Sequence, residues 1–420
     1  MQQIFFEGQS KREQSQTRLN SAECSLSSIF YQLIQVALGL RPFLSHSPSA
    51  DEWGELYAMA TKQSLIGVCF AGVQRLQTQR KKPPEMTYFT WMGMAAKIQQ
   101  RNEVVNRQCV ELQAKLAADG VRSCILKGQG VAALYRLHDG SWTTQASQGP
   151  SATSLTTGAD NDNIHNSSDL SMLRQSGDID VWMDANEEAA LRWVKKYQRE
   201  LDFDYKHVHL DVIEGTSVEV HYRPSTSRVP WYMRRVEQFT REKACWTNAV
   251  ALGDGTVNVP SLEFNLVFIL QHIFGHLFAE EMTLKQYLDY YFVLKQAHVE
   301  GADVQEAYRW MQRMGMGSFA RATMWLLREV FGMPEEWMIC EADADEGRFL
   351  LDRVMAKEQK AKKGEHGSVR WHLSVFWAQQ SKNLHLLTHY PLEVMFSPLW
   401  LVRHFFWKRI WKMKHKELFV

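Results

Sequence analysis

The chain contains 420 residues, of which 45% are hydrophobic and 12% aromatic, so it can build a large core and is not a disordered protein. Lys and Arg (48) nearly balance Asp and Glu (47), and the net charge of +1 argues against a protein whose whole surface binds polyanions. Nucleic acid is therefore a partner that the composition allows but does not favour.

Six scattered cysteines without a C-x-x-C pair indicate free thiols in a reducing compartment, rather than a disulfide framework or a structural zinc site. The N-terminus shows no signal-peptide pattern, and no window of about 18 residues is apolar enough for a membrane-spanning helix. We therefore expect a cytoplasmic protein without a transmembrane segment.

The first part of the chain is predicted to be helical. Residues 1–20 are polar and are predicted to form a disordered lead-in. Beyond them, apolar residues recur at the three- and four-residue spacing of amphipathic helices. This spacing predicts helices over residues 29–37, 53–61, 66–76 and 86–118. Together these helices make up an N-terminal helical region over residues 21–118.

At Val121 the pattern changes to that of a strand followed by a glycine turn. Residues 121–126 fit a buried strand, 127–130 a tight turn and 131–137 a helix. Such a unit forms an anion site, because unpaired backbone N–H groups and the positive end of the helix dipole face the turn. Lys127 adds a positive charge, so Lys127 and Gly128 are candidate phosphate-binding residues.

The same turn fits a loose form of the dinucleotide-binding fingerprint, Gly128-x-Gly130-x-x-Ala133. That motif requires a second parallel strand ending in an acidic residue about 20 positions later. Residues 139–175 are instead rich in Ser, Thr, Asn and Gly without periodicity, which predicts a flexible insertion. Dinucleotide binding is therefore the weaker interpretation.

Residues 176–182 are predicted to form a short strand that carries Asp178 and Asp180. Side chains at i and i+2 of a strand share a face, so the two carboxylates lie side by side, with Cα atoms about 6.6 Å apart. A divalent cation would offset their repulsion. The alternative is an edge strand with a solvated acidic face. An amphipathic helix is expected next, over residues 186–201.

Residues 205–222 are predicted to form a hairpin in which polar and apolar residues alternate. A three-residue loop over 214–216 would give two apolar pairs on one face: Val212 with Val218, and Leu210 with Val220. The same register gives two polar pairs on the other face: Asp211 with Glu219, and His209 with His221. The hairpin thus has one apolar face and one face of carboxylates and histidines.

Packing of the apolar face against helices would leave Glu219, and in this register Asp211, beside the strand with Asp178 and Asp180. Three carboxylates around Mg²⁺ or Mn²⁺ suit phosphoryl chemistry, because hard oxygen ligands hold the ion while it binds substrate phosphates. Asp178, Asp180 and Glu219 are therefore the candidate catalytic and metal-binding residues.

The first strand of the hairpin also suggests zinc as an alternative metal. His207-x-His209-x-Asp211 matches the start of the metallo-β-lactamase pattern H-x-H-x-D-H. Val212 stands where the last histidine belongs, so histidines on a half-exposed strand are preferred over a zinc hydrolase.

Residues 256–420 are predicted to form a C-terminal helical region. Helices are expected over residues 262–278, 284–294, 304–314 and 319–330, and a solvated linker over 358–366. His272 and His276 share one face of the first of these helices. Without further recognisable zinc ligands, core or hydrogen-bonded histidines are the preferred interpretation.

Residues 400–416 mix five aromatic side chains with Lys and Arg. Such a stretch would suit peripheral contact with an acidic membrane surface or with a nucleic acid. A terminal helix that docks its aromatic stripe on the core and keeps its basic side chains outside is the preferred interpretation.

Four segments together resemble a known family: Ile125-Leu126-Lys127-Gly128, Leu134-Tyr135, Arg174-x-x-Gly177-Asp178-Ile179-Asp180 and Val218-Glu219-Val220-His221-Tyr222. They are similar to the L-K-G, tyrosine, R-x-x-G-D-I-D and I-E-L-H-W motifs of the uncharacterised nucleotidyltransferase family of bacteria, which looks like a branch of the polymerase-β-type superfamily. The resemblance is best over residues 116–222. The helix with His272, followed by Asp289, resembles the family less specifically.

The resemblance implies an α+β fold, in which a small mixed nucleotidyltransferase sheet is flanked by N- and C-terminal helical regions. The core is expected over residues 119–255. The resemblance further implies Mg²⁺ (or Mn²⁺) bound by Asp178 and Asp180, Glu219 as a third carboxylate, and an NTP such as ATP as substrate.

Four residues are expected to bind the nucleotide: Lys127, Gly128, Arg174 and His221. Lys127 and Gly128 are expected near its phosphates, and Arg174 would steady a phosphate or orient the aspartates. The predicted reaction is transfer of NMP from an NTP to a hydroxyl acceptor with release of pyrophosphate. The alternatives are a non-catalytic nucleotide-binding or interaction protein on the same fold, and a toxin-like enzyme that modifies tRNA or protein.

Overall fold

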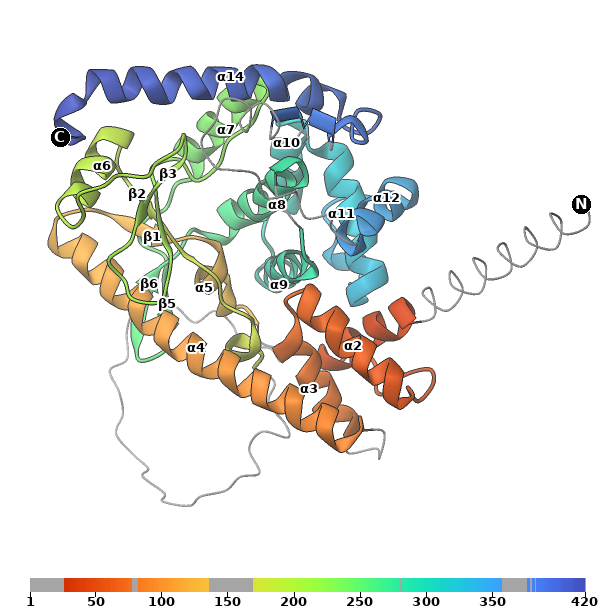
Figure 1. Cartoon of the computed structure of the whole chain (residues 1–420). Coiled ribbons are helices and arrows are strands. Elements are labelled where there is room, and N and C mark those ends of the chain that lie inside the picture. Colours follow the sequence, from red (N-terminus) through yellow and green to blue (C-terminus); the bar gives the residue numbers. More distant parts are fainter. Residues whose placement is uncertain are drawn as a thin grey trace, which may run out of the picture.

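The computed structural model describes residues 26–77, 82–135, 169–279, 282–356, 376–377, 380–381 and 383–419. Over these residues a small mixed sheet and a two-stranded hairpin are surrounded by helices (Figure 1), which confirms the predicted α+β class. The predicted lead-in (1–20), the predicted linker (358–366) and most of the predicted insertion (139–175) lie outside the described residues.

Helices form the N-terminal part of the described chain, as predicted. Residues 26–37 are helical, followed by α2 (Ala50–Lys62), α3 (Ile66–Gln77) and α4 (Glu85–Ala118). A capping box starts α2, because Ser49 Oγ accepts from Glu52 N at 3.3 Å and Glu52 Oε2 accepts from Ser49 N at 2.7 Å. At 1.5 Å per residue α4 is about 50 Å long. It runs past both the N-terminal helices and the sheet and so connects them (Figure 1).

Four short strands form the mixed sheet in the order β1-β2-β4-β3. Their bounds are Ser123–Ile125 (β1), Ile179–Met183 (β2), His207–Leu210 (β3) and Val218–His221 (β4). β2 and β4 run parallel, whereas β1 and β3 are antiparallel to their neighbours. Apolar side chains on one face of the sheet share a core with α4 and α6 (Glu187–Lys195); they include Ile179, Val181, Val208, Val218 and Val220.

A second hairpin, β5 (Ala249–Leu252) and β6 (Gly255–Asn258), was not expected from the sequence. Gln113 of α4 joins it to the sheet, because its Nε2 donates to the carbonyl oxygens of Ser123 at 3.0 Å and Asn258 at 3.2 Å. The two four-residue strands are too short for their alternation to stand out in the sequence.

The predicted register of the β3–β4 hairpin is wrong by two residues. Leu210 pairs with Val218 and His209 with Glu219, so β3 ends before Asp211. Asp211 is exposed in the connecting turn and is not opposite Glu219. A shift of two residues keeps every side chain on its predicted face, so the apolar and polar faces of the hairpin are unchanged.

The longer turn has a physical cause in its contacts with α4. Arg101 Nη2 donates to Gly215 O and to Thr216 Oγ1, both at 2.7 Å. Gln108 Nε2 donates to Glu214 O at 3.2 Å. These bonds hold residues 211–217 as a loop instead of letting the two strands extend toward each other.

Two predicted helices have different bounds. α5 spans Lys127–Ala132 with a kink at Gly128, whose φ and ψ are not helical, so this short helix ends before the predicted segment 131–137 does. The expected helix over residues 186–201 ends at Lys195, because the chain after it turns back and Phe203 pairs with Val208 of β3.

Helices make up most of the described C-terminal part. They are α7 (Pro230–Lys243), α8 (Leu262–Ala279), α9 (Leu284–Glu300), α10 (Val304–Arg313), α11 (Gly317–Phe331), α12 (Ala344–Met355) and α14 (Pro391–Lys414). The four helices predicted here correspond to α8 to α11. α8 covers the polar face of the sheet, where Trp182 of β2 stacks on Phe264 with ring centroids 5.2 Å apart.

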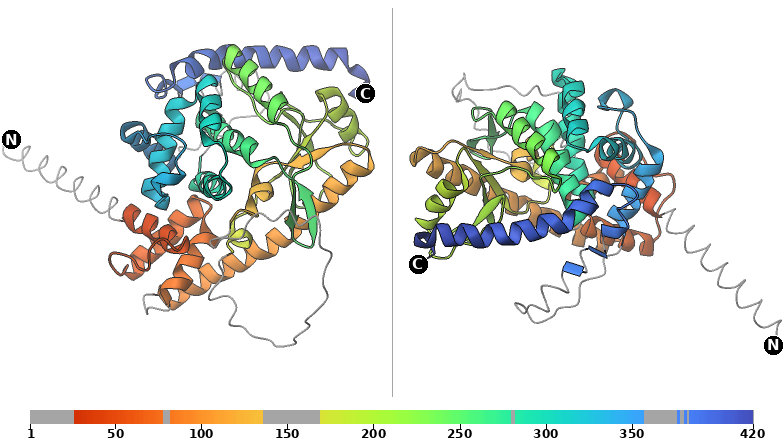
Figure 2. Two further views of the ribbon diagram at one scale, coloured as in Figure 1. Left: turned by 180° about the vertical axis from the view of Figure 1, so that it is seen from behind. Right: turned by 90° about the horizontal axis from the view of Figure 1, so that it is seen from above.

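α14 crosses one outer edge of the molecule and reaches the sheet (Figures 1 and 2). Trp411 is buried and lies against Phe203, with ring centroids 5.2 Å apart, so this helix docks on the core. The predicted docking of its whole aromatic stripe is only partly confirmed, because Phe405 and Phe406 are exposed. Its opposite face keeps large hydrophobic side chains exposed. Among the described residues, no helix combines the length and the apolar character needed to cross a membrane.

Candidate active site

The candidate site lies on the polar face of the sheet, where β2 and β4 run side by side. Their register places Asp180 directly opposite Glu219. Asp178 shares this face because it precedes Asp180 by two residues. Asp180 is only 2% exposed, and its backbone oxygen accepts a hydrogen bond from Leu126 N at 2.8 Å. The three carboxylates selected from the sequence therefore come from two adjacent segments of one sheet.

Two of the residues expected to bind nucleotide contact the carboxylates directly. Lys127 Nζ lies 3.0 Å from Asp180 Oδ2, and His221 Nε2 lies 2.9 Å from Asp180 Oδ1. The same imidazole nitrogen lies 3.2 Å from Glu219 Oε2. His221 thus bridges the two opposed carboxylates, and Lys127 approaches one of them from the start of α5.

The negative charges in this cluster outnumber the positive ones. Burial raises the pKa of Asp180, but Lys127 and His221 outweigh it and hold that pKa well below its usual value. Burial lowers the pKa of His221, yet its hydrogen bonds to Asp180 and Glu219 raise it above the usual value. Burial and the charge of Asp180 raise the pKa of Asp178. Three carboxylates that share one lysine and one histidine are suited to an added cation.

The backbone that presents Lys127 has an unusual conformation. Gly128 has φ 47° and ψ −116°, a combination that residues with a Cβ rarely adopt, and Lys127 itself has φ 22°. The chain therefore turns sharply between β1 and α5, and the Lys127 ammonium reaches Asp180. Because α5 is only six residues long, Lys127 supplies the positive charge here rather than a helix dipole.

Arg174 belongs to a second, separate charge cluster. Its Nε and Nη2 donate to the two carboxylate oxygens of Asp289 in α9, at 2.7 Å and 2.8 Å. Tyr135 Oη donates to Asp289 Oδ1 at 2.6 Å, and all three side chains are buried. Burial lowers the pKa of Arg174, but Asp289 raises it above its usual value. Asn102 Nδ2 donates to the Arg174 backbone oxygen at 2.8 Å, so this cluster anchors the segment that leads into β2.

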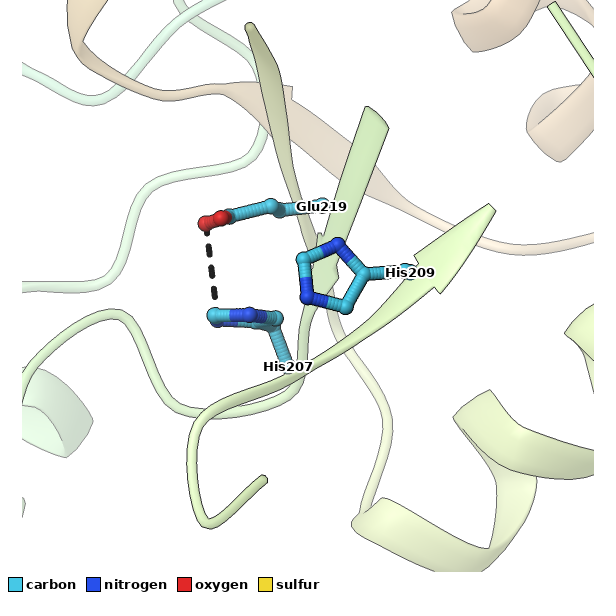
Figure 3. Close-up of side chains that lie close together, drawn as sticks. All are labelled: His207, His209 and Glu219. Atoms are coloured by element: carbon cyan, nitrogen blue, oxygen red, sulfur yellow. Dashed lines mark ion pairs between the residues drawn. The ribbon is translucent and has the colours of Figure 1, made fainter. Parts of the chain in front are cut away.

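β3 adds two histidines beside Glu219 (Figure 3). His207 Nδ1 lies 3.4 Å from Glu219 Oε2, an approach that lacks the geometry of a hydrogen bond. Burial and the charge of His221 lower the pKa of His207 to about 4, so its imidazole is neutral at neutral pH. His209 lies directly opposite Glu219.

Two groups of side chains in the described part of the chain could hold a metal ion. They are Asp180, Glu219 and His221, and His207, His209 and Glu219, and within each group the ligand atoms lie within 4.8 Å of one another. The carboxylate-rich group, together with Asp178, suits Mg²⁺ or Mn²⁺. The histidine-rich group suits a softer ion such as Zn²⁺.

His272 of α8 forms the hydrogen-bonded pair preferred from the sequence, because its Nε2 lies 2.9 Å from His276 Nε2. Burial and the charge of Lys127 lower the pKa of His272 well below its usual value, so this imidazole is neutral. α8 lies on the same face of the sheet as the carboxylate cluster, because its Phe264 stacks on Trp182, which follows Asp180 by two residues in β2.

Lys285 of α9 was missed as a site residue. Its Nζ donates at 3.4 Å to the backbone oxygen of Gln175, which lies between Arg174 and Asp178 in the chain, so Lys285 lies between the two charge clusters. Burial and the charge of Arg174 lower its pKa to about 8, while Asp289 and Asp178 oppose this shift. The sequence offers one signal for this position. Lys285 precedes Asp289 by four residues, about one helical turn, so the two side chains share a helix face.

A family model described as an uncharacterised nucleotidyltransferase matches residues 49–139 and 170–332, which is more than half of the chain. The chain belongs to this family. No curated protein and no solved structure matches it. The match to the uncharacterised nucleotidyltransferase family includes every residue of both charge clusters and leaves out residues 140–169, which lie within the predicted insertion, and α14. Membership gives the chain a nucleotidyl-transfer role in general terms.

Proposed function

We propose that the protein is a Mg²⁺-dependent nucleotidyltransferase that moves NMP from an NTP to a hydroxyl acceptor and releases pyrophosphate. The observation that carries this proposal is the parallel register of β2 and β4, which sets Asp180 opposite Glu219 with Asp178 on the same face. Membership in a nucleotidyltransferase family supports it.

The side chains of the site fit a divalent cation. Carboxylate oxygens are the ligands that Mg²⁺ and Mn²⁺ prefer, and Asp178, Asp180 and Glu219 supply them. Burial and, to a smaller extent, the charge of Asp180 raise the pKa of Asp178, and a bound cation would offset this by favouring the ionised carboxylate. When bound, the ion would neutralise charge on the transferred phosphoryl group.

The remaining side chains have distinct roles in this proposal. His221 holds Asp180 and Glu219 in place through its Nε2. Lys127 and Lys285 supply positive charge for the triphosphate, and Lys127 exchanges its contact with Asp180 for a phosphate oxygen. Arg174 is a positioning residue, because its guanidinium is bound to Asp289 and its backbone leads into β2.

The reaction balances with these groups. The acceptor hydroxyl oxygen forms a bond to the α-phosphorus, and the bond from that phosphorus to the bridging oxygen of pyrophosphate breaks. Pyrophosphate leaves, and Glu219, whose side chain is 19% exposed against 1% for Asp180, accepts the hydroxyl proton.

The test is label transfer from NTPs that carry the label at either the α or the γ phosphate, with Mg²⁺ and a cell extract as the source of acceptors. We expect the wild type to transfer α label and Asp180→Asn to lose at least about a hundredfold in rate. Asp211→Asn is the matched control, since Asp211 is an exposed aspartate of the same region and should retain full activity.

Three outcomes would contradict the proposal. A folded Asp180→Asn protein with wild-type transfer would exclude the assigned mechanism. Transfer of γ label alone would indicate a kinase. Nucleotide binding without any transfer would favour the non-catalytic interpretation.

A further inference from the structure

α14 has two apolar faces, and only one of them is covered by the rest of the described chain. On the covered face, Trp411 lies against Phe203 and Trp407 against Tyr205, with ring centroids 5.2 Å and 5.1 Å apart. The opposite face lies along the outer edge of the molecule (Figures 1 and 2). It carries seven large hydrophobic side chains that are 37–63% exposed: Leu392, Met395, Leu399, Val402, Phe406, Ile410 and Met413.

These seven side chains form one continuous stripe. They follow one another at intervals of three or four residues, and at 100° per residue they fall within an arc of about 80°. The stripe is about 32 Å long at 1.5 Å per residue. Exposed hydrophobic residues on a soluble surface are usually scattered, so a stripe of this length marks an interaction surface.

All exposed charge on α14 is positive. Arg403 and Lys414 border the stripe on one side, and Arg409 borders it on the other, given the helical spacing. Lys412 is also exposed but lies toward the covered face, with its Nζ 5.1 Å from the ring centroid of Phe419. The one acidic residue of this helix, Glu393, is buried and accepts a hydrogen bond from Ser227 Oγ at 3.0 Å. The surface therefore combines an apolar stripe with cationic borders.

We propose that α14 binds the surface of an anionic lipid bilayer, with the apolar stripe among the acyl chains and the basic side chains at the acidic headgroups. The helix would lie in the interface, because none of the described helices is suited to span a membrane. The proposal does not depend on the proposed reaction.

The same charges and side chains disfavour two other partners. A second copy packed on this stripe about a two-fold axis would bring two sets of cationic borders together, and their repulsion opposes the contact. Single-stranded nucleic acid stacks its bases on aromatic side chains, whereas six of the seven stripe residues are not aromatic.

The covered face of α14 links this surface to the candidate active site. Phe203 and Tyr205, which it contacts, lie in the segment that leads into β3. Membrane binding would therefore hold the strand with His207 and His209 on the side of α14 that faces away from the bilayer, one helix diameter (~10 Å) from it.

The test is co-sedimentation of the full chain with phosphatidylglycerol vesicles and with neutral phosphatidylcholine vesicles. We expect binding to the anionic vesicles that weakens as salt is added. Leu399→Glu/Phe406→Glu should lower the partition coefficient more than about tenfold. Arg403→Gln/Arg409→Gln, one basic residue from each border of the stripe, should lower it about 30-fold on anionic vesicles, from about fivefold per basic residue.

Matched control variants on α4 distinguish binding by this surface from non-specific binding of exposed residues to vesicles. Met86 and Phe89 are exposed hydrophobic residues, and Lys97 and Arg107 are exposed basic ones. Met86→Glu/Phe89→Glu and Lys97→Gln/Arg107→Gln should bind vesicles like the wild type. The proposal is overturned if the wild type stays in the supernatant, or if the stripe variant binds as well as the wild type. It is also overturned if that variant instead abolishes dimerisation or RNA binding while vesicle binding is absent.

Discussion

Two charge clusters, one buried and one partly buried, lie close together in this protein and differ in how their charges are matched. In the first, Arg174 and Asp289 share two hydrogen bonds of 2.7 Å and 2.8 Å, and Tyr135 adds a third of 2.6 Å. In the second, three carboxylates share Lys127 and His221, through contacts on Asp180 and Glu219 of 2.9–3.2 Å. The charges of the first cluster cancel, and we call it the closed cluster. The second keeps an excess of negative charge, and we call it the open cluster.

This difference distinguishes a cluster that stabilises the fold from one that is suited to bind a cation. A closed ion pair needs no further partner, and removal of one member leaves a buried charge without compensation. A cluster of like charges is instead stabilised when one of them is removed or when a cation binds. Neutralising an aspartate should therefore lower the free energy of unfolding in the closed cluster and raise it in the open cluster.

The largest effect is expected from breaking the closed cluster. Asp289→Asn leaves Arg174 charged, buried and without its carboxylate, and should lower the free energy of unfolding by about 3–5 kcal/mol. Chemical denaturation measures this loss. As a control, Glu188→Gln removes an exposed partner of Arg192 and should cost about 0.5 kcal/mol at most. Equal costs for the two variants would contradict the account.

A smaller effect is expected at the turn that brings Lys127 to the open cluster. Gly128→Ala forces a residue with a Cβ into φ 47°, ψ −116°, and should lower the stability by about 1–3 kcal/mol. Activity should fall as well, because Lys127 loses its position. Gly93→Ala in the interior of α4 has open space around the new Cβ and should stabilise the protein by about 0.5–1 kcal/mol. A gain in stability at Gly128 would show that the turn is not strained.

Lys285 lies between the clusters and should make nucleotide binding depend on pH. Burial and Arg174 lower its pKa to about 8, so it loses its charge as the pH rises above that value. The affinity for NTP should then fall about tenfold, the size of one charged contact. Lys285→Arg should keep the affinity constant between pH 7 and 9, as measured by titration at fixed salt. An unchanged fall in Lys285→Arg would remove Lys285 from the proposed site.

The smallest effect tests the open cluster itself. The folded protein holds the pKa of Asp178 above its usual 3.8, chiefly through burial, so ionisation of this group costs stability at neutral pH. Asp178→Asn should therefore stabilise the metal-free protein at pH 7 by about 1 kcal/mol. The gain should shrink as the pH falls through the raised pKa of folded Asp178 and vanish below about 3.8, where this carboxyl is protonated in both states. Thermal unfolding should show Asp178→Asn to be more stable than the wild type in EDTA and less stable in Mn²⁺, because only the wild type is stabilised by the ion.

Most of the open cluster could be predicted from the sequence, because side-chain alternation is local. Asp180 and Glu219 share a face in any register that keeps the apolar residues inside, so an error of two residues did not affect them. The same error misplaced Asp211, since Arg101, more than 100 residues earlier, decides the length of the turn. Long-range packing of this kind leaves no local pattern.

The closed cluster was predicted only in part for the same reason. Arg174 belongs to a recognisable motif, but its partner Asp289 lies 115 residues later, on a helix whose rotation depends on the core around it. The motif alone therefore left open whether Arg174 steadies a phosphate or orients the aspartates, and the position of its guanidinium on Asp289 could not be read from it. Lys285 was missed because its position follows from that of Asp289.

The most direct test of the central claim is a titration of the protein with Mn²⁺ in the presence of a non-hydrolysable NTP analogue. The electron paramagnetic resonance signal of the free ion measures how much Mn²⁺ is bound. Wild type and Asp211→Asn should bind Mn²⁺ with equal affinity, and Asp178→Asn/Asp180→Asn should lose this binding while remaining folded. The affinity should rise with pH as His221, whose pKa its hydrogen bonds to Asp180 and Glu219 raise despite burial, releases its proton. Equal Mn²⁺ affinity in the double variant and the wild type would contradict the assignment of the open cluster as a cation site.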